Sequence, residues 1–436
     1  MSGPARAGAI DRIASARRDM PVVTGIAAGH PAPGPLSGRM IAACVHLTPE
    51  TVVLVEVLRG LGARLRLCAA NPLSTQDGVA EHLGRMPGVD VVVGSPDWDG
   101  YIWAVEEVAG GGADLVIDDG ADLILAMQAH GEPQDRRLLG ACENTSTGAL
   151  RLQAAQSAGG LGVPVFAITR GAAKRLYDDL HGTGQSVLDA LLHTTNLLLA
   201  GRVAVVAGYG TCGRGIAARL RALGARVVVT EISPQAALEA SLDGLAVEPM
   251  AEAIRDADLV VTATGSRDVV TEQHLVHAKD GVILANAGHF DVEIDAEWLR
   301  ETGTGTLVRP GLESYSLPSG QDVLLVAEGR VVNLAAAAGH PPAVMDVTFA
   351  TVALCLLELG GLVEVGSTGN GTATATGVQR YPVGVHSVPE HIDTTVARLA
   401  LGQAGVRLDL PTTVQQEYLQ TWGGPVRAMS GRDHAE

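Results

Sequence analysis

Aromatic residues are scarce in this sequence: Phe, Trp and Tyr make up 3% of a chain that is 47% hydrophobic. Small and branched aliphatic side chains are typical of parallel sheets covered on both faces, so this composition predicts an α/β protein. Cysteine is scarce as well. The five cysteines show no CxxC spacing, which argues against a disulfide framework or a zinc site and predicts no bound metal.

Basic residues are too few to balance the acidic ones. The chain holds 31 Lys and Arg against 48 Asp and Glu, a formal net charge of −17. Binding to nucleic acid or to an anionic membrane requires a basic surface, so neither is expected as a partner. No uninterrupted apolar run reaches the ~18 residues of a membrane span, and no apolar signal-peptide core is visible. Together with reduced thiols, these absences predict a cytoplasmic protein.

Two series of alternating strands and helices follow one another along the chain. Residues 1–38 are predicted as a partly disordered lead-in followed by one helix. Strands are expected at 40–47, 63–70, 90–94, 114–120 and 163–169, and then at 202–208, 226–231, 258–264 and 281–288. Such alternation implies βαβ units. The predicted fold class is α/β, with two Rossmann-like doubly wound parallel-sheet domains and a short C-terminal helical segment.

A glycine-rich turn between a predicted strand and helix indicates a dinucleotide site. In VAVVAGYGTCGRGIAARL, Gly208 makes the tight turn, Gly210 admits a pyrophosphate and Gly213 lets helix and strand pack closely. The next strand ends at Glu231, close to the ~20-residue offset of the ribose-binding acid. A carboxylate there accepts from both ribose hydroxyls of NAD and repels the phosphate of NADP, so NAD is the predicted cofactor. The alternative is an ordinary βα turn with an incidental acid.

The flanking motifs resemble the conserved stretches of the S-adenosylhomocysteine hydrolase family. They include GTGQSVLDALLHTTNLLLAGRVAVVAGYG, LANAGHFDVEID and LLVAEGRVVNLAAAAGHPPAVMDVTFA, with VHLTPET, NPLSTQD, VIDDGADL and ENTSTG in the first half. The resemblance runs from about Met40 to Trp422 and is closest to the archaeal-type branch. It implies that tightly held NAD oxidises a ribose 3′-hydroxyl, that the 5′-thioether leaves and water adds, and that the ketone is then reduced. It further implies an adenine nucleoside as substrate, a homo-oligomer (dimer or tetramer) and a role in one-carbon metabolism.

The same resemblance implies a domain organisation. A substrate-binding domain is expected at 1–183, completed by 346–390, and an NAD-binding domain at 197–345. A C-terminal tail is expected at 391–436, with two short helices between 389 and 422. The Gly/Thr-rich stretch at 360–379 is predicted to be a surface loop or a disordered insertion.

Individual site residues are also implied by the resemblance. Lys174 and Asp178, four residues apart on a predicted helix, match the pair at the sugar hydroxyls, with the lysine pKa lowered by burial; a surface salt bridge is the alternative. Glu50 would accept from the adenine amino group, which inosine lacks. The remaining matches are His46 and Asp119 around the 4′ and 5′ positions, His289 near the leaving group, Thr48, His340, Met345 and Phe349 at adenine, and Thr145, Ser146, Thr147, Thr211, Cys212, Asn286 and Asn333 along the cofactor.

The sugar site and the tail depart from the family pattern. Asn144 stands where the family has a second glutamate facing the ribose hydroxyls, and Asp179 stands where it has an asparagine. If these positions are neighbours, the carboxylate has changed places, and Asp179 takes over any proton transfer because an amide is not a base. Thr169 and Arg170 replace an Asn-Asp pair. The tail also lacks the closing Lys and Tyr of much of the family.

Three functions are compatible with these residues. The first is hydrolysis of S-adenosylhomocysteine to adenosine and homocysteine. The second is an adenine-nucleoside 3′-epimerase or dehydrogenase in nucleoside natural-product metabolism, without elimination at C5′. The third, a catalytically silent NAD-binding regulator, is disfavoured because Lys174, Asp178, His46 and Asp119 are all retained. The sequence does not separate the first two.

Overall fold

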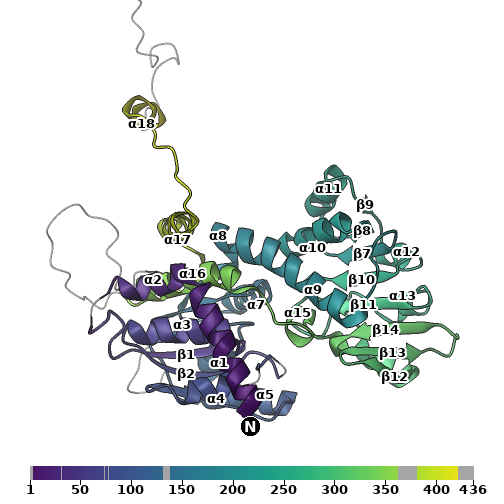
Figure 1. Cartoon of the computed structure of the whole chain (residues 1–436), viewed down its shortest axis with the longest axis horizontal. Coiled ribbons are helices and arrows are strands. Elements are labelled where there is room, and N and C mark those ends of the chain that lie inside the picture. The colour runs from purple at the N-terminus through teal and green to yellow at the C-terminus, as the bar shows by residue number, and fades with distance from the viewer. Residues whose placement is uncertain are drawn as a thin grey trace, which may run out of the picture.

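The chain folds into two lobes, each built around one β-sheet (Figure 1). The computed structural model describes residues 3–30, 32–72, 74–76, 78–130, 138–361 and 381–420. The predicted loop at 360–379 therefore lies almost entirely outside the described residues, as does the end of the tail.

The first sheet, sheet A, has seven parallel strands and two buried faces. Alternate residues of the central strand point to opposite cores, with Ile41, Ala43 and Val45 on one side and Ala42 and Cys44 on the other. Such alternation within a wholly apolar run is what a doubly covered parallel sheet requires. The strand order is β15 (Gly384–Ser387), β6 (Pro164–Ala167), β5 (Gly140–Glu143), β4 (Leu115–Asp118), β1 (Met40–Val45), β2 (Arg64–Ala69) and β3 (Val89–Val91).

The second sheet, sheet B, has eight strands and is mixed. Six strands are parallel, and β12 and β13 add an antiparallel edge beside β14. The prediction of a purely parallel sheet missed this edge because every residue of β12 is exposed and gives no apolar run. The order is β12 (Thr304–Arg309), β13 (Leu312–Ser316), β14 (Asp322–Val326), β11 (Val282–Asn286), β10 (Leu259–Thr262), β7 (Val203–Ala207), β8 (Arg226–Thr230) and β9 (Ala246–Val247).

Helices cover both faces of each sheet. The first lobe carries α3 (Pro49–Gly60), α4 (Val79–Gly84), α5 (Trp98–Gly110), α6 (Asp122–His130), α7 (Ser146–Ser157), η1 (Ile168–Arg170) and α8 (Ala172–Lys174). The π-helix η2 (Arg175–Gly182) and α9 (Thr183–Thr195) lead to the second lobe. That lobe carries α10 (Thr211–Ala222), α11 (Pro234–Leu242), α12 (Met250–Ala253), α13 (Glu272–Leu275), α14 (Ala296–Thr302), η3 (Ala327–Gly329) and α15 (Val332–Ala335).

The N-terminal segment forms two helices, α1 (Gly3–Arg18) and α2 (Pro21–Ala28), so the prediction of a partly disordered lead-in with a single helix was wrong. The cause is a contact that no local pattern reveals. The Asp346 carboxylate accepts from the backbone amides of Val22 and Val23, at 2.9 and 2.7 Å, and so caps α2. A carboxylate at a helix N-terminus is stabilising.

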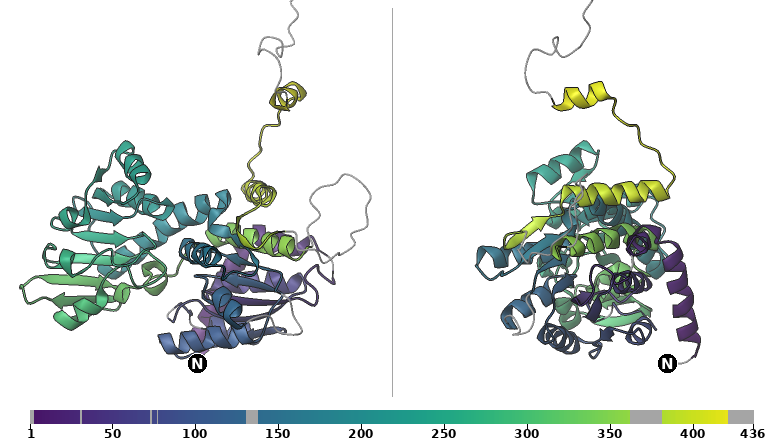
Figure 2. Two further views of the ribbon diagram at one scale, coloured as in Figure 1. Left: turned by 180° about the vertical axis from the view of Figure 1, so that it is seen from behind. Right: turned by 90° about the vertical axis from the view of Figure 1, so that its left-hand side faces the viewer.

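The chain returns to the first lobe through α16 (Pro342–Leu359), which is long and apolar enough to cross a membrane by composition alone. Because 72% of that stretch is buried against sheet A and its helices, α16 is a core helix. Helix α17 (Glu390–Gln403) packs on α16 and shares this core, although the sequence placed it in the tail. Helix α18 (Thr413–Gln420) stands away from both lobes (Figure 2). The predicted domain boundaries stay a prediction.

Candidate active site

A cavity of about 790 Å³ lies between the two lobes. Its walls come from the carboxyl ends of strands in both sheets, where open α/β sheets usually bind ligands. Most of the predicted site residues line it, namely His46, Thr48, Glu50, Asp119, Asn144, Thr145, Ser146, Thr147, Lys174, Asp178, Asp179, Gly210, Thr211, Cys212, His289, Asn333, His340, Met345 and Phe349.

The turn after β7 is built by Gly208, Gly213 and Glu231, which do not line the cavity, together with Gly210, which does. Gly208 has φ +92, and a Cβ at Gly213 would lie 1.9 Å from the Gly208 carbonyl oxygen, so both positions require glycine. A Cβ at Gly210 would meet nothing within 4 Å, which leaves the backbone open toward the cavity. Glu231 follows β8, and its carboxylate accepts from three backbone amides, including that of Tyr209 at 2.7 Å.

Asn286 does not line the cavity. It is fully buried, and its amide oxygen accepts from the Thr262 hydroxyl and the Gly288 amide. Its amide nitrogen donates to the carbonyls of Gly288, Phe290 and Gly329. Every donor and acceptor of this side chain is therefore used inside the protein, and the side chain fixes the loop that carries His289. The predicted place of Asn286 along the cofactor stays a prediction.

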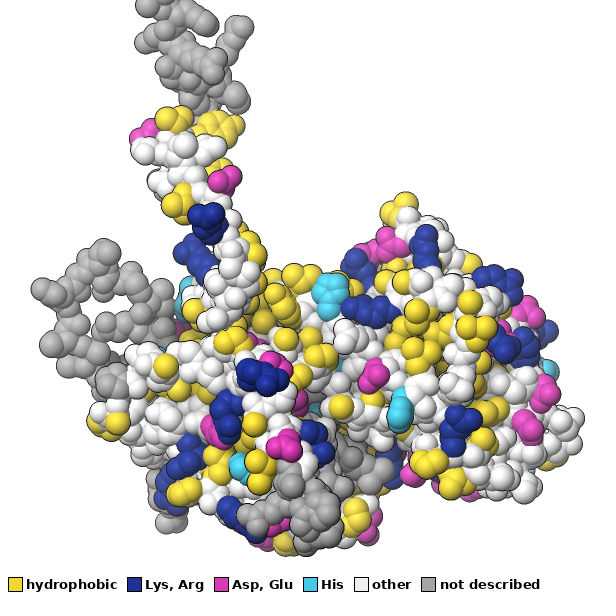
Figure 3. Space-filling view, in the orientation of Figure 1, with side chains coloured by type: hydrophobic (Ala, Val, Ile, Leu, Met, Phe, Trp, Pro, Cys, Tyr) yellow, Lys and Arg dark blue, Asp and Glu magenta, His cyan; other side chains and the backbone are white. Residues whose placement is uncertain are grey.

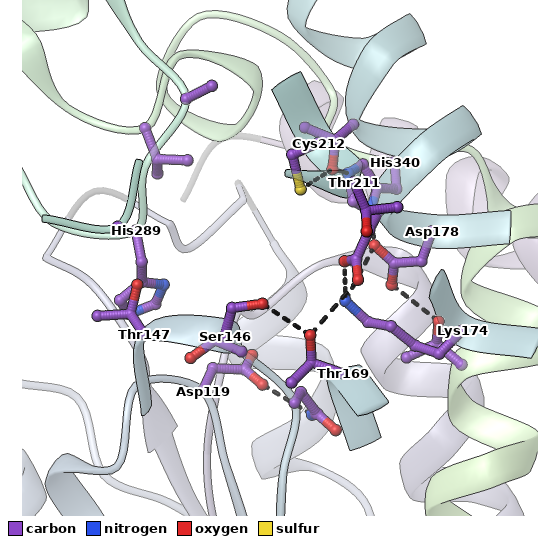
Figure 4. A pocket seen from close by; sticks show the side chains of 18 of the residues that line it. Asp119, Ser146, Thr147, Thr169, Lys174, Asp178, Thr211, Cys212, His289 and His340 are labelled. Carbon is purple, nitrogen blue, oxygen red and sulfur yellow. Dashed lines mark hydrogen bonds and ion pairs between the residues drawn. The ribbon is translucent and has the colours of Figure 1, made fainter. Parts of the chain in front are cut away.

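Lys174 lies between two buried carboxylates. Its ammonium is 3.5 Å from Asp178 and also donates to Asp179, and all three residues are at most 6% exposed (Figure 4). An α-helix would turn position i+5 away from Lys174, whereas the wider π-helix η2 brings i+4 and i+5 to one face. The sequence predicted only the first of these pairs, because it assumed an α-helix.

The Lys174 ammonium stays charged in this surrounding. Burial alone lowers the lysine pKa, but Asp178 and Asp179 outweigh it and the pKa is raised, so the predicted lowering was wrong. Burial on its own would raise the pKa of the Asp178 carboxyl. Lys174 and His340 outweigh burial and hold that pKa well below its usual range. Asp179 has fewer partners, and burial raises its pKa in spite of Lys174.

The opposite wall carries the predicted acid–base residues. Asp119 follows β4 and accepts from the Asn144 amide nitrogen at 2.7 Å and from the backbone amide of His46 at 3.3 Å. The His46 imidazole makes no hydrogen bond to Asp119. Burial raises the pKa of Asp119. Asn144 and Asp179 line the same cavity, and their hydrogen bonds go to other residues, so the exchange of a carboxylate between them stays a prediction.

His46 and His289 approach each other from different lobes, with ring centroids 5.7 Å apart. The approach depends on Gly120, where a Cβ would lie 2.7 Å from the His289 ring. Burial, followed by the charge of His340, lowers the pKa of His46 to about 4, and burial with the charge of His46 does the same for His289. Both imidazoles are therefore neutral near pH 7 and able to accept a proton.

Four buried polar atoms on the cavity wall have no partner among the described residues. Buried polar groups are almost always hydrogen-bonded, so unpartnered ones beside a cavity indicate where a ligand supplies the missing partners. They are His46 Nδ1, Asn144 Oδ1, His289 Nε2 and Asn333 Oδ1.

The predicted adenine pocket divides in the structure. Glu50 and Thr48 lie together at the first turn of α3, where burial raises the Glu50 pKa and a hydrogen bond from Thr48 opposes the rise. His340 lines the cavity too, but its ring nitrogens contact Asp178 at 3.2 Å and Thr183 at 3.4 Å. His340 therefore belongs to the Lys174 cluster in this structure.

Sequence reasoning gave no site role to three threonines of that cluster, although it noted Thr169 as a departure from the family pattern. Thr348 donates to Asp178 at 2.8 Å, Thr169 donates to Asp179 at 3.4 Å, and Thr183 contacts His340. One signal was available. The chain has two lysines, Lys174 and Lys279, among its 31 basic residues, and the others are arginines. A lysine in a chain that otherwise uses arginine indicates a position where the two side chains are not interchangeable.

Comparison with known proteins identifies the family of the chain. The S-adenosyl-L-homocysteine hydrolase model matches residues 5–139, and the model of the NAD-binding domain of that enzyme matches residues 179–339. The chain is 45% identical over 413 residues to adenosylhomocysteinase of Aeropyrum pernix, covering 93% of this chain and 94% of that protein. It is 43% identical over 419 residues to S-inosyl-L-homocysteine hydrolase of Methanopyrus kandleri, covering 94% of each.

A third relative, adenosylhomocysteinase of Thermotoga maritima, is 42% identical over 407 residues, covering 93% of this chain and 97% of that protein. At these coverages the matches extend over both lobes. The chain belongs to the S-adenosyl-L-homocysteine hydrolase family.

Proposed function

We propose that this protein hydrolyses S-adenosylhomocysteine reversibly to adenosine and homocysteine, through transient oxidation of the ribose 3′-hydroxyl. The observation that carries the proposal is the pairing of two chemical groups across one cavity. Lys174 with its two carboxylates forms one wall, and Asp119, His46 and His289 form the other. The first group suits proton transfer at a sugar hydroxyl, and the second suits proton transfer at carbon and at a leaving group.

NAD fits the second-lobe side of the cavity. Gly210 leaves open backbone at the N-terminus of α10, where the helix dipole favours a pyrophosphate. The Asn333 amide nitrogen donates to the Ser186 hydroxyl at 3.1 Å. Its buried amide oxygen has no partner among the described residues and is suited to accept from the carboxamide of NAD. When bound there, NAD supplies the hydride acceptor for a secondary alcohol.

The chain's own residues supply proton transfer and orientation. Lys174 would meet the ribose hydroxyl, since its ammonium faces the cavity and is fixed by Asp178 and Asp179. His46 or Asp119 would take the proton of the carbon next to the ketone and pass it to the leaving sulfur, and His289 would guide the water. Closure of the lobes would exclude bulk water from the ketone.

An adenine base is favoured by Glu50. Relatives of similar identity are named for adenosyl and for inosyl substrates, so overall similarity does not choose between them. A buried carboxyl beside Thr48 on the cavity wall is suited to accept from an exocyclic amino group. We therefore place the adenine ring against the first turn of α3.

Free thiol is the decisive product. Purified protein incubated with S-adenosylhomocysteine should release homocysteine, detected with a thiol reagent, and denatured protein should yield NAD and no NADP. Reduction of bound NAD without thiol would instead support the epimerase or dehydrogenase, which the names of the relatives do not favour. Glu231→Ala should lower NAD occupancy, because loss of a charge-assisted hydrogen bond costs about 2–3 kcal/mol.

A homo-oligomer in the cytosol completes the proposal. Residues 404–420 leave the first lobe as an arm whose apolar side chains are exposed, with Leu410 at 87%, Val414 at 70% and Leu419 at 78% (Figure 3). A second copy of the chain is the occupant we assign to this arm. Light scattering of the full chain and of a chain ending at residue 403 tests the assignment: the shorter chain should dissociate.

A reducing compartment suits the five free cysteines.

A further inference from the structure

Beyond the wall residues, one line of hydrogen bonds leads away from Lys174. The ammonium donates to Asp179, whose other oxygen accepts from the Thr169 hydroxyl at 3.4 Å. Thr169 Oγ1 lies 2.7 Å from Ser146 Oγ, at the first residue of α7 (Figure 4). Lys174, Asp179 and Thr169 are buried, whereas Ser146 is exposed. The line therefore joins a buried ammonium to the open side of the cavity.

We propose that Asp179, Thr169 and Ser146 form a proton relay that takes up the proton of the ribose hydroxyl through Lys174. This inference rests on the proposed function. Oxidation of a secondary alcohol removes a hydride from carbon, which NAD accepts, and a proton from oxygen. As the hydroxyl proton moves to Lys174 Nζ, one Nζ proton moves to Asp179 Oδ1. Lysine ends as it began, Asp179 is protonated, and the later reduction of the ketone reverses the transfer.

Asp178 is the wrong acceptor for this proton. One of its oxygens contacts both Lys174 and His340, and the other accepts from Thr348, which is buried. These partners stabilise a permanent negative charge. Asp179 has one charged hydrogen-bond partner, Lys174, and its other oxygen accepts from the Thr169 hydroxyl. The opposite pKa directions of the two carboxyls, lowered for Asp178 and raised for Asp179, agree with this division.

Both hydroxyls can reverse direction, as a relay requires. While Asp179 is ionised, Thr169 donates to it and Ser146 donates to Thr169. Once Asp179 carries the proton on Oδ1, rotation of its carboxyl group brings that proton to Thr169, and rotation of the two hydroxyls lets Ser146 donate to solvent. The remaining charged or titratable neighbours of Asp179 are Asp178, His340 and Cys212, and none of them lies on the line.

Single-turnover measurements on the NAD-loaded protein with adenosine test the relay. Reduced nicotinamide is followed by absorbance, and released protons by an indicator dye in weak buffer. The wild type should release one proton in step with reduction. Thr169→Val should reduce NAD but release its proton roughly 10-fold or more later, and Thr169→Ser should restore the rate. Thr351→Val is the matched control, because this buried hydroxyl on α16 donates only to the Val347 carbonyl at 2.9 Å.

Asp179→Asn should slow reduction by about 10²–10⁴-fold, the usual contribution of a proton acceptor, and Asp179→Glu should recover part of it. Full reduction in Asp179→Asn, or a Thr169→Val proton that appears as early as in the wild type, would overturn the relay. No reduction in the wild type would refute the proposed function instead. The relay is then decided by infrared spectra recorded during acid titration without substrate: one carboxylate band lost on mild acidification should still be seen to titrate in Asp178→Asn and should be missing in Asp179→Asn, and the reverse would overturn it.

Discussion

Removing the Lys174 ammonium should destabilise the protein more at neutral pH than at acid pH. Two unit charges 3.5 Å apart, the distance to Asp178, attract by about 5 kcal/mol at an effective dielectric constant of ~20. Desolvation of buried ions offsets much of that gain, but deleting one partner leaves the others uncompensated. Lys174→Gln should therefore cost about 3–5 kcal/mol of unfolding free energy at neutral pH.

The pH dependence follows from the sign of the shifts. In the wild type the Asp178 pKa is lowered by folding, so the stabilisation is present above the unfolded pKa and is lost as pH falls through the folded pKa. Without Lys174, burial should raise the pKa of both carboxyls. As pH falls they become protonated, which removes the uncompensated buried charges that destabilise the variant. The gap between the two proteins should narrow as pH approaches about 4, the unfolded value for Asp.

Urea unfolding at neutral and mildly acid pH measures this gap, and the chain provides its own control. Lys279→Gln removes the other lysine, which is 45% exposed and pairs with Asp258 at 2.7 Å, so its loss should cost about 1 kcal/mol or less. Lys174→Arg should recover part of the stability but no activity, because arginine does not exchange protons. A cost for Lys174→Gln no larger than for Lys279→Gln, or one independent of pH, would refute the reasoning.

Three further predictions test other contacts. Gly215→Ala places a Cβ 2.0 Å from the Leu180 carbonyl oxygen of η2, so it should lower the unfolding free energy by about 1–3 kcal/mol or more and weaken NAD retention. Gly402→Ala on α17 is the control: its Cβ would meet open space, so thermal stability should stay unchanged or rise. Asp346→Ala removes the cap of α2 and should cost about 1–3 kcal/mol in urea unfolding; an unchanged value would contradict the capping role. Glu50→Gln should lower the preference for S-adenosyl over S-inosyl substrate by roughly 10-fold or more in competition assays, and an unchanged preference would remove Glu50 from base recognition.

Much of the site could be predicted because it sits at strand ends. Apolar runs such as those ending at Val45 and Ala207 mark parallel strands, and the polar residues that follow them meet at one edge of a sheet. The fit of these residues to one family then supplied their expected roles. What the sequence could not give were relations set by distant packing, such as the cap of α2 by a residue 324 positions away.

Local helix geometry was the second source of error. The spacing of Lys174 and Asp178 predicts contact in an α-helix, and nothing in the sequence signals the wider η2 that adds Asp179. The lysine pKa followed the same error, since one carboxylate does not outweigh burial as clearly as two do. Asn286 shows a further limit: a motif fixes the position of an amide but does not tell that its side chain holds a loop.

The two cavity histidines lead to a final prediction, a loss of stability in mild acid. Folding lowers the pKa of both His46 and His289 to about 4, whereas an unfolded histidine titrates near 6.5. Between these pKa values the unfolded chain binds protons that the folded chain does not bind. The full unfolding free energy is therefore present above the unfolded pKa and decreases as pH falls toward the folded pKa. Each ring should contribute at most about 3 kcal/mol of this loss, reduced by water in the cavity.

Unfolding of the NAD-free protein, measured from neutral pH to about pH 4, isolates this effect from ligand binding. His46→Gln and His289→Gln should each flatten the pH dependence, and the double variant should flatten it most. Imidazole resonances of the folded wild type should titrate well below those of the unfolded chain. Equal slopes in wild type and double variant would mean that the rings are solvated and charge freely, and neutral His46 would then lose its place as a resting proton acceptor. A flattened slope would show the physical cost of keeping that acceptor neutral beside the substrate.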